Sequence, residues 1–302
     1  MKVERPKISV IIPVYNRERS IVKAVDSVLL QSFKNFEIVI VDDCSTDNSV
    51  GVVKEFIDYR IKVFQLEKNS GAAAARNYGI QQCTSEFISF LDSDDTFEED
   101  FLKVTHETLS NSGDDIGFMW TGSNILQDAK IDKQFWQPKR METPQLTFLK
   151  ELKIGTGAGI TVKREVFEKC GYFDERLPAA EDTEFFFRIT QSYDYVNAPQ
   201  YLINIYRDNN DRMSKNFKNI ARAYNIFLPT YFSIINRDKF LQTKFYYKMM
   251  WLNYHLRDKR KARNYYEKIP KGLRSKKIKG IKALYEFLPL KSASYLHKKL
   301  SI

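Results

Sequence analysis

The sequence predicts an α/β protein whose N-terminal third forms a parallel, doubly wound sheet. Short apolar runs rich in β-branched residues alternate with stretches of helical periodicity, which is the pattern of repeated βαβ units. Three of these runs end in polar or acidic residues, at Tyr15-Asn16, Asp42-Asp43 and Asp92-Ser93-Asp94-Asp95. Parallel topology brings strand ends to one edge of a sheet, so we expect a ligand site at that edge.

The first part of the chain divides into alternating elements. Ile21, Val25 and Val28 recur at helical spacing after the first strand, and Ser45 begins a segment with N-cap chemistry after the second. Gly71 introduces an alanine-rich helix that carries Arg76. In chain order we expect strands at 8–14, 36–41, 60–66 and 86–91. We expect helices at about 18–31, from the capping residues Ser45-Thr46-Asp47 through about Tyr59, and from 72 onward.

The pattern is less regular beyond a helix at about 99–111. Residues 116–125 fit one strand or two, and 129–144 have the composition of an irregular segment. The glycines of 155–159 allow a backbone to approach a ligand closely, but they fit a bulge or tight bend equally well. The expected elements that follow are a helix from Glu181, a strand at 195–206, a polar loop at 207–214 suited to closing over a ligand, and helices beyond 215.

Composition restricts the class of protein. Of the 302 residues, 43% are hydrophobic and regularly interrupted by polar residues, as in a folded globular protein. The three cysteines are widely spaced and match neither a zinc site nor a disulfide framework, which favours a reducing cytosol. The N-terminus lacks the apolar core of a secretory signal, and no run is apolar enough to span a bilayer. We therefore expect a cytoplasmic protein.

Several common functional motifs are missing from the sequence. No GxGxxG follows the first strand and no GxxxxGK[ST] occurs, so neither a dinucleotide fingerprint nor a P-loop is present. His106, His255 and His297 are scattered and form no HExxH, and there is no GxSxG elbow for a nucleophilic serine. The acidic strand ends therefore carry the strongest chemical signal.

The acidic cluster of Asp92, Asp94 and Asp95 has two interpretations. Carboxylates are rarely buried without a partner, and their oxygens suit Mg²⁺ and Mn²⁺, which commonly bridge to phosphate groups. The same residues could instead cap a helix that begins near Phe97. The pair Glu181-Asp182 also has two interpretations. Acids are favourable in a first helical turn, so the pair could simply stabilise a helix, but a carboxylate held there can also act as a general base.

Five segments together resemble the enzymes of glycosyltransferase family 2. In that family's order and spacing, they are Ser9–Asn16, Val41–Asp47, Asn69–Asn77, Leu91–Asp95 and Glu181-Asp182. The resemblance covers about 7–214 and implies the GT-A fold, a Rossmann-like mixed sheet flanked by helices. It implies a catalytic domain at 1–215, with a nucleotide-binding half at about 1–111 and an acceptor half at about 112–215. The basic, aromatic region at 216–302, which we expect to be helical, lies outside the resemblance.

The resemblance assigns the nucleotide to the first two strand ends and to the helix after them. Pro13, Tyr15, Asn16 and Asp43 match residues that hold the nucleotide in the family. Asp43 would accept a hydrogen bond from the imide N–H of the base. Arg76 matches the family's basic residue near the diphosphate.

The remaining family positions fall on the acidic segments. Asp92 matches the residue that faces the ribose, and Asp95 matches one that shapes the donor sugar pocket. Asp94 matches the ligand of a divalent metal, Mn²⁺ or Mg²⁺. Asp182 matches the catalytic base of the inverting enzymes, and Glu181 stands beside it.

One position departs from the family pattern. After the Tyr206-Arg207 pair, where many relatives carry a histidine, this chain has Asn209. A histidine contribution to the metal or diphosphate site is therefore not expected.

The resemblance implies an inverting transfer of a hexose or N-acetylhexosamine. The donor would be a nucleoside-diphosphate sugar, with UDP as the expected nucleotide. The acceptor would be a hydroxyl of a glycan or lipid-linked glycan in bacterial surface polysaccharide synthesis. The alternative is a non-catalytic sugar-nucleotide-binding protein of the same fold, which the intact Asp94 and Asp182 disfavour.

The net charge of +10 is concentrated near the C-terminus. Residues 255–302 hold 15 Lys and Arg against three Asp and Glu. Amphipathic helices of aromatic and basic residues can lie on anionic membranes, which would place the protein at the cytoplasmic face of the inner membrane. The same aromatic residues could instead pack against the catalytic domain or a second subunit of a homodimer. No nucleic-acid-binding motif accompanies the charge, so we expect no nucleic acid partner.

Overall fold

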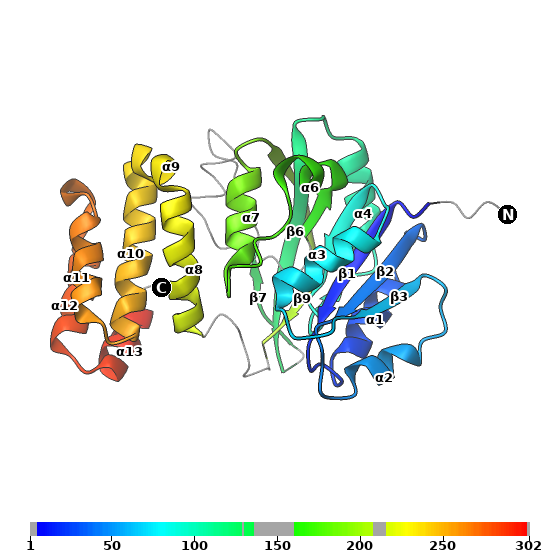
Figure 1. Cartoon of the computed structure of the whole chain (residues 1–302), viewed down its shortest axis with the longest axis horizontal. Helices are drawn as coiled ribbons and strands as arrows, with labels where there is room; N and C mark the ends of the chain where they lie inside the picture. The colour runs from blue at the N-terminus through cyan, green and yellow to red at the C-terminus, as the bar shows by residue number, and fades with distance from the viewer. Residues whose placement is uncertain (1–4, 129, 136–159, 208–215, 301–302) are drawn as a thin grey trace. The chain divides into compact units, whose positions relative to one another are not determined.

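The computed structural model describes residues 5–128, 130–135, 160–207 and 216–300, and Figure 1 shows the chain coloured along its length. The chain divides into two compact units. One comprises residues 1–175 with 181–210, and the other comprises 176–180 with 211–302.

The first unit is built on one mixed sheet. Its strands are β1 (Ile8–Val14), β2 (Phe36–Asp42), β3 (Ile61–Gln65), β4 (Phe87–Phe90), β5 (Thr96–Phe97), β6 (Ile116–Gln127), β7 (Lys130–Phe135), β8 (Ile160–Lys163) and β9 (Asp194–Tyr206). The order is β3-β2-β1-β4-β8-β6-β9-β5, with β7 paired to β6. The first four strands are parallel, as the alternating pattern predicts, and β8 runs antiparallel to β4 and β6.

The helices of the first unit follow the predicted order except for α6 (Arg164–Cys170), which the sequence pattern did not predict. They are α1 (Ile21–Leu29), α2 (Ser49–Lys54), α3 (Ala72–Gln82), α4 (Phe101–Ser110), α6 (Arg164–Cys170) and α7 (Glu181–Ile189). The helix predicted to follow the capping residues Ser45-Thr46-Asp47 and to run through about Tyr59 is shorter than expected, because only Ser49–Lys54 is helical. Ser45 and Thr46, before this helix, hydrogen-bond to Asn16 in the loop after β1.

Of the four segments whose pattern is irregular, the structure tests the predictions for two, at least in part. Residues 116–127 form one strand, with register shifts against β9, rather than two. The prediction of an irregular segment at 129–144 is wrong for Lys130–Phe135, which forms β7 and pairs with β6. The glycines of 155–159 and most of the polar loop at 207–214 lie outside the described residues.

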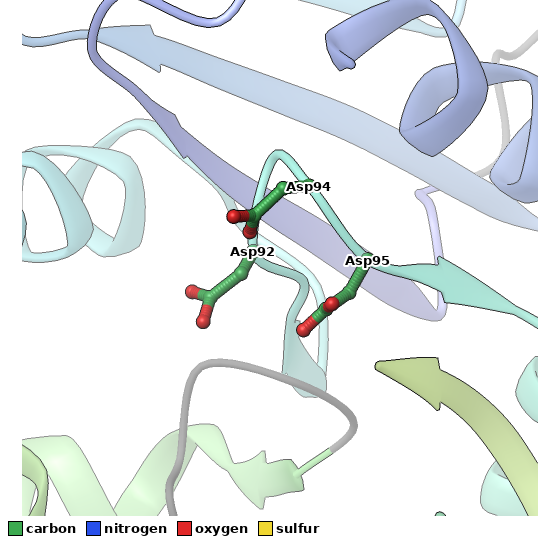
Figure 2. A group of neighbouring side chains, drawn as sticks. All are labelled: Asp92, Asp94 and Asp95. Carbon is green, nitrogen blue, oxygen red and sulfur yellow. The ribbon is translucent and has the colours of Figure 1, made fainter. Parts of the chain in front are cut away.

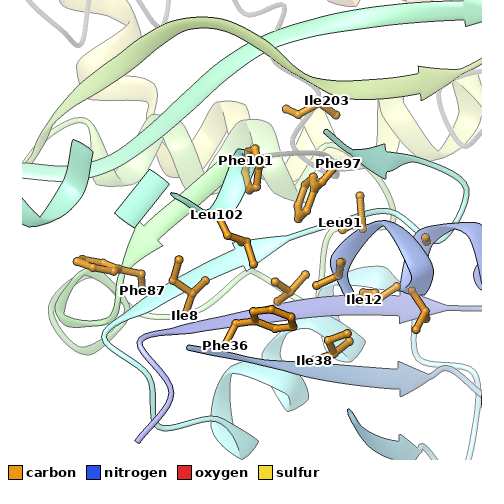
Figure 3. Close-up of a cluster of buried hydrophobic side chains, with 14 of the residues drawn as sticks. Ile8, Ile12, Phe36, Ile38, Phe87, Leu91, Phe97, Phe101, Leu102 and Ile203 are labelled. Atoms are coloured by element: carbon orange, nitrogen blue, oxygen red, sulfur yellow. The ribbon is translucent and has the colours of Figure 1, made fainter. Parts of the chain in front are cut away.

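The core of the first unit lies where α1 and α4 cover one face of the sheet (Figure 3). Alternate β1 side chains, Ile8, Val10 and Ile12, point into this core and are fully buried. Phe97 stacks on Phe101 with ring centroids 3.9 Å apart. Each fully buried side chain of this size contributes about 1.5–3 kcal/mol, so the core fixes the strand ends of β1, β2 and β4 in space.

Helix α3 packs closely against the opposite face of β1. A Cβ placed at Gly79 would lie 2.7 Å from Cγ2 of Ile11, which is closer than van der Waals contact allows. Gly79 therefore lets the helix approach the strand, and this contact sets the position of Arg76 one turn earlier in α3.

We expect Gly79→Ala to destabilise the protein by about 1–3 kcal/mol, because the added methyl group overpacks the α3–β1 contact. Gly280→Ala is the matched control, since Gly280 is also helical but has nothing within 4 Å of the added Cβ. The control should be neutral or stabilising by up to about 1 kcal/mol from helix propensity. Thermal denaturation checks both variants, and equal melting temperatures would contradict the close contact.

The second unit is helical beyond residue 215 and rich in aromatic side chains, as predicted. Its helices are α8 (Phe217–Thr230), α9 (Phe232–Arg237), α10 (Lys239–His255), α11 (Lys259–Lys268), α12 (Lys276–Phe287) and α13 (Leu290–Leu300). Met250, Tyr254, Tyr266, Ile281 and Tyr285 belong to its buried core. Within the described part of the chain, no helix combines the length and apolar character needed to cross a membrane.

Candidate functional site

The acidic cluster forms the turn between β4 and β5 (Figure 2). One carboxylate oxygen from each of Asp92, Asp94 and Asp95 lies within 4.8 Å of the others. The helix-capping interpretation is wrong, because Thr96–Phe97 forms β5 and pairs with β9, while α4 begins only at Phe101. The three carboxylates thus converge at the end of a buried strand.

The three carboxylates differ in how firmly the protein holds them. Asp95 is buried, and its Oδ1 accepts a hydrogen bond of 3.0 Å from the backbone N–H of Tyr206 in β9. Asp94 Oδ2 lies 3.9 Å from Nε of Arg17, and its side chain is 27% exposed. Three hard oxygen donors in this space fit Mg²⁺ or Mn²⁺, which keep several waters and take one or two protein carboxylates. Asp94 has the looser contact and is free to turn toward such an ion.

The loops after β1 and β2 are hydrogen-bonded to each other. The backbone N–H of Asn16 donates to Oγ of Ser45 at 2.9 Å, and Oδ1 of Asn16 accepts from the N–H of Thr46 at 2.8 Å. Asn16 has φ of 52°, a left-handed conformation that asparagine adopts more readily than most residues. This pairing leaves Tyr15 44% exposed and Pro13 partly exposed at the same strand end.

Asp43 ties the end of β2 to the start of α3. Its carboxylate accepts hydrogen bonds from the backbone N–H groups of Ser70 at 2.6 Å and Gly71 at 2.8 Å. Burial raises the pKa of Asp43, with these two hydrogen bonds opposing and the charge of Asp42 adding to the rise. Each carboxylate oxygen retains a lone pair, so Asp43 can still accept a hydrogen bond from a ligand.

Arg76 connects the acidic cluster with α7. Its side chain is only 5% exposed, Nη2 donates to Asp92 Oδ1 at 3.1 Å, and Nη1 donates to Glu181 Oε1 at 2.9 Å. Burial disfavours the cation, but the charges of Asp92, Glu181 and Asp182 outweigh it and raise the pKa of Arg76. The guanidinium therefore stays charged between the two carboxylates.

Glu181 and Asp182 begin α7, as the sequence predicts, but their environments differ. Glu181 is buried, and burial together with the charge of Asp182 raises its pKa against the opposing effect of Arg76. Asp182 is half-buried, and its Oδ1 accepts from the N–H of Thr183 at 2.5 Å and from its hydroxyl at 3.2 Å. Of the two acids, Asp182 is the more accessible to an acceptor.

Sequence reasoning passed over two residues that shape this site. Arg17 faces Asp94, as described above, and Asn77 anchors the segment before α7. Asn77 donates to the carbonyl of Phe173 at 2.9 Å and to Glu175 at 2.8 Å, and it accepts from the N–H of Phe173 at 3.0 Å. The signal for Asn77 was a polar side chain on the buried face of an alanine-rich helix, beside Arg76.

The mixed sheet flanked by helices is the architecture of a GT-A glycosyltransferase. Residues 9–171, more than half of the chain, match the family model described as Glycosyl transferase family 2. The chain therefore belongs to glycosyl transferase family 2.

Two curated relatives come from bacteria. The putative teichuronic acid biosynthesis glycosyltransferase TuaG of Bacillus subtilis is 39% identical over 141 residues, 45% of this chain and 55% of TuaG. WfgD of Escherichia coli, named as a UDP-Glc:alpha-D-GlcNAc-diphosphoundecaprenol beta-1,3-glucosyltransferase, is 36% identical over 148 residues, 49% of this chain and 57% of WfgD. The matched stretches thus span little more than half of either relative.

Solved structures establish the fold. S. aureus TarS 1–349 in complex with UDP-GlcNAc superposes with a TM-score of 0.70 at 20% identity, covering 98% of this chain and 91% of that one. The mannosyltransferase PcManGT of Pyrobaculum calidifontis, in complex with GDP-Man and Mn²⁺, gives a TM-score of 0.59 at 17% identity, covering 98% and 88%. The GT-A fold, a mixed sheet flanked by helices with a helical C-terminal region, is confirmed.

Proposed function

We propose that this glycosyltransferase is a metal-dependent inverting enzyme that uses a nucleoside-diphosphate sugar. The observation that carries the proposal is the convergence of Asp92, Asp94 and Asp95 within 4.8 Å, joined through Arg76 to the helix that bears Asp182. A donor-binding carboxylate cluster and a separate base are the two parts that a single inverting displacement needs.

Each residue has a role in this proposal. Asp94 would hold Mn²⁺ or Mg²⁺, and such an ion supplies positive charge to the departing nucleoside diphosphate. Asp92 would orient the ribose and Asp95 would shape the sugar pocket. Asp182 would take the proton of the acceptor hydroxyl as that oxygen attacks the anomeric carbon from the face opposite the leaving group.

The nucleotide would lie against the ends of β1 and β2. Asp43 is held rigidly by two backbone N–H groups and can accept from the imide N–H of a uracil base. Pro13, Tyr15 and Asn16 would line the same subsite, where the paired loops fix the backbone.

The names of the relatives support a UDP-sugar donor and a surface-glycan acceptor. TarS was solved with UDP-GlcNAc, WfgD is named for UDP-Glc and a diphosphoundecaprenol-linked acceptor, and TuaG is named for teichuronic acid biosynthesis. We therefore propose transfer of a hexose or N-acetylhexosamine to a hydroxyl of a glycan or lipid-linked glycan.

A panel of nucleotide sugars tests the donor and the chemistry together. With Mn²⁺ present, release of UDP from a UDP-hexose or UDP-N-acetylhexosamine is expected, and the NMR spectrum of the first product should show an inverted anomeric centre. Release from no donor in the panel, together with tight UDP binding, would favour the alternative of a non-catalytic sugar-nucleotide-binding protein. A product of retained configuration would refute single displacement.

The C-terminal region, which we propose begins near residue 216, has an unneutralised basic surface. Lys276, Lys277 and Lys279 in α12 are exposed, and none of them has an ion pair within the described residues. The acids of 255–302 are all engaged: Asp258 with Lys261, Glu267 with Arg274, and Glu286 with Arg263, which lowers the pKa of Glu286 to about 2.

Exposed apolar side chains accompany these lysines. Phe287, at the end of α12, is 85% exposed, and Tyr295 and Leu296 in α13 are 59% and 36% exposed. Lysines attract anionic headgroups and exposed apolar groups enter the interface, so we propose that α12 and α13 contact an anionic membrane at its cytoplasmic face. This location would bring a lipid-linked acceptor within reach.

Replacing Lys276, Lys277 and Lys279 together by glutamine should weaken binding to phosphatidylglycerol vesicles by about a hundredfold, at roughly 1 kcal/mol per basic residue. Phe287→Ser should also reduce recovery in flotation. Ile57→Ser is the matched control, since Ile57 is fully exposed outside this region and its loss should change nothing. If the lysine variant were recovered with the vesicles as fully as the wild type, the membrane proposal would be refuted. A dimer in sedimentation that Phe287→Ser dissociates would assign the surface to a second copy of the chain.

A further inference from the structure

Arg76 presents little of its guanidinium to a substrate diphosphate. Nη1 and Nη2 each bind a carboxylate, and Nε is buried without a hydrogen-bond partner among the described residues. The whole side chain is 5% exposed. A diphosphate ligand of the usual kind presents an accessible, unoccupied fork of N–H groups, and the geometry here is different.

The two carboxylates that Arg76 joins come from distant parts of the sequence. Asp92 follows β4 in the donor-binding cluster, and Glu181 is the first residue of α7, directly before Asp182. The next residue of α3, Asn77, binds the backbone of Phe173 and the side chain of Glu175, just ahead of α7. One turn of α3 therefore holds both the donor cluster and the chain that leads to α7.

We propose that Arg76 and Glu181 are positioning residues, a buried bridge that sets Asp182 at a fixed place relative to the acidic cluster. Glu181, with its side chain 9% exposed, acts through Arg76, while the more accessible Asp182 meets the acceptor. The bridge matters for transfer because an error of about 1 Å between base and donor costs about a hundredfold in rate. The role in transfer rests on the proposed function, whereas the bridge itself can be tested without turnover.

A double-mutant cycle on the full-length chain tests the bridge. Arg76→Met and Glu181→Leu each leave a buried charge without this partner, and the double variant removes both charges. We expect each single variant to melt at a lower temperature than the double variant, because the two changes are coupled. If the loss in melting temperature of the double variant equalled the sum of the losses of the two single variants, the proposed bridge would be refuted.

Calorimetric titration with UDP and Mn²⁺ separates bridging from direct contact with the donor. A bridging Arg76 predicts that Arg76→Met and Glu181→Leu weaken UDP binding by factors within about threefold of each other. If Arg76→Met alone weakened binding by more than about tenfold, Arg76 would be a diphosphate ligand and the proposal would be wrong.

Glu181→Gln distinguishes a positioning residue from a second base. The substitution is conservative, so this variant should fold even if Arg76→Met or Glu181→Leu does not. Its amide oxygen can still accept from Nη1 of Arg76 but cannot take a proton. Hydrolysis of UDP-GlcNAc should fall by less than about tenfold, against about a thousandfold for Asp182→Asn. Equal losses in the two variants would make Glu181 a base. If the wild type turned over no donor, the proposed sugar transfer would be refuted. The melting temperatures and the UDP titrations would still show whether Arg76 and Glu181 form the bridge.

Discussion

Asp182→Asn is expected to lower the rate of sugar transfer by about a thousandfold while leaving the dissociation constant for UDP nearly unchanged. Asparagine has the size of aspartate and can keep the hydrogen bonds from Thr183, but it cannot accept the proton of an attacking hydroxyl. Asp182 lies outside the cluster of Asp92, Asp94 and Asp95, so the donor site should survive the change. Steady-state rates of UDP release and calorimetric titration of UDP measure the two effects separately.

Asp26→Asn is the matched control for this experiment. Asp26 is an exposed residue of α1 that is not among the candidate site residues, and its amide variant should retain full activity. Turnover of Asp182→Asn within about tenfold of the wild type would reassign the base to another group. A parallel loss of UDP binding would instead indicate that Asp182 holds the donor.

The sequence predicts where the candidate site residues lie in the fold because its signals are local. The apolar run of β4 is followed directly by the acids, so the sequence alone places Asp92 to Asp95 at a strand end. The same holds for Glu181 and Asp182, whose position at the start of α7 follows from helical periodicity. Local patterns of this kind also predict the four parallel strands correctly.

What could not be predicted depends on contacts between distant residues. The capping interpretation stayed open because nothing near Thr96 shows that it pairs with Asn204, more than a hundred residues later. The helix expected after the capping residues Ser45-Thr46-Asp47 begins at Ser49 and ends at Lys54, well before Tyr59. Arg76 resembles a diphosphate ligand in sequence, and only the fold brings it between Asp92 and Glu181.

Asp94→Ala is expected to remove the metal dependence of donor binding. Asp94 offers the most adaptable carboxylate of the cluster, since its described contact is a 3.9 Å pair with Arg17, whereas Asp95 is fixed by Tyr206 and Asp92 by Arg76. In the wild type, Mn²⁺ should tighten UDP binding because an ion held by Asp94 also faces the diphosphate. In the variant, UDP should bind equally with and without Mn²⁺.

The rate of transfer in Asp94→Ala should fall by at least about tenfold, since even residues that only support metal ligands cost about 10- to 100-fold when removed. Asp26→Ala, which deletes an exposed carboxylate of α1, is the control and should keep the Mn²⁺ response. An unchanged Mn²⁺ titration in Asp94→Ala would refute its role as ligand and shift the ion to Asp92 or Asp95. Because Arg76 already neutralises part of the charge on Asp92, Asp94 remains the carboxylate of the cluster best able to give its full charge to a cation.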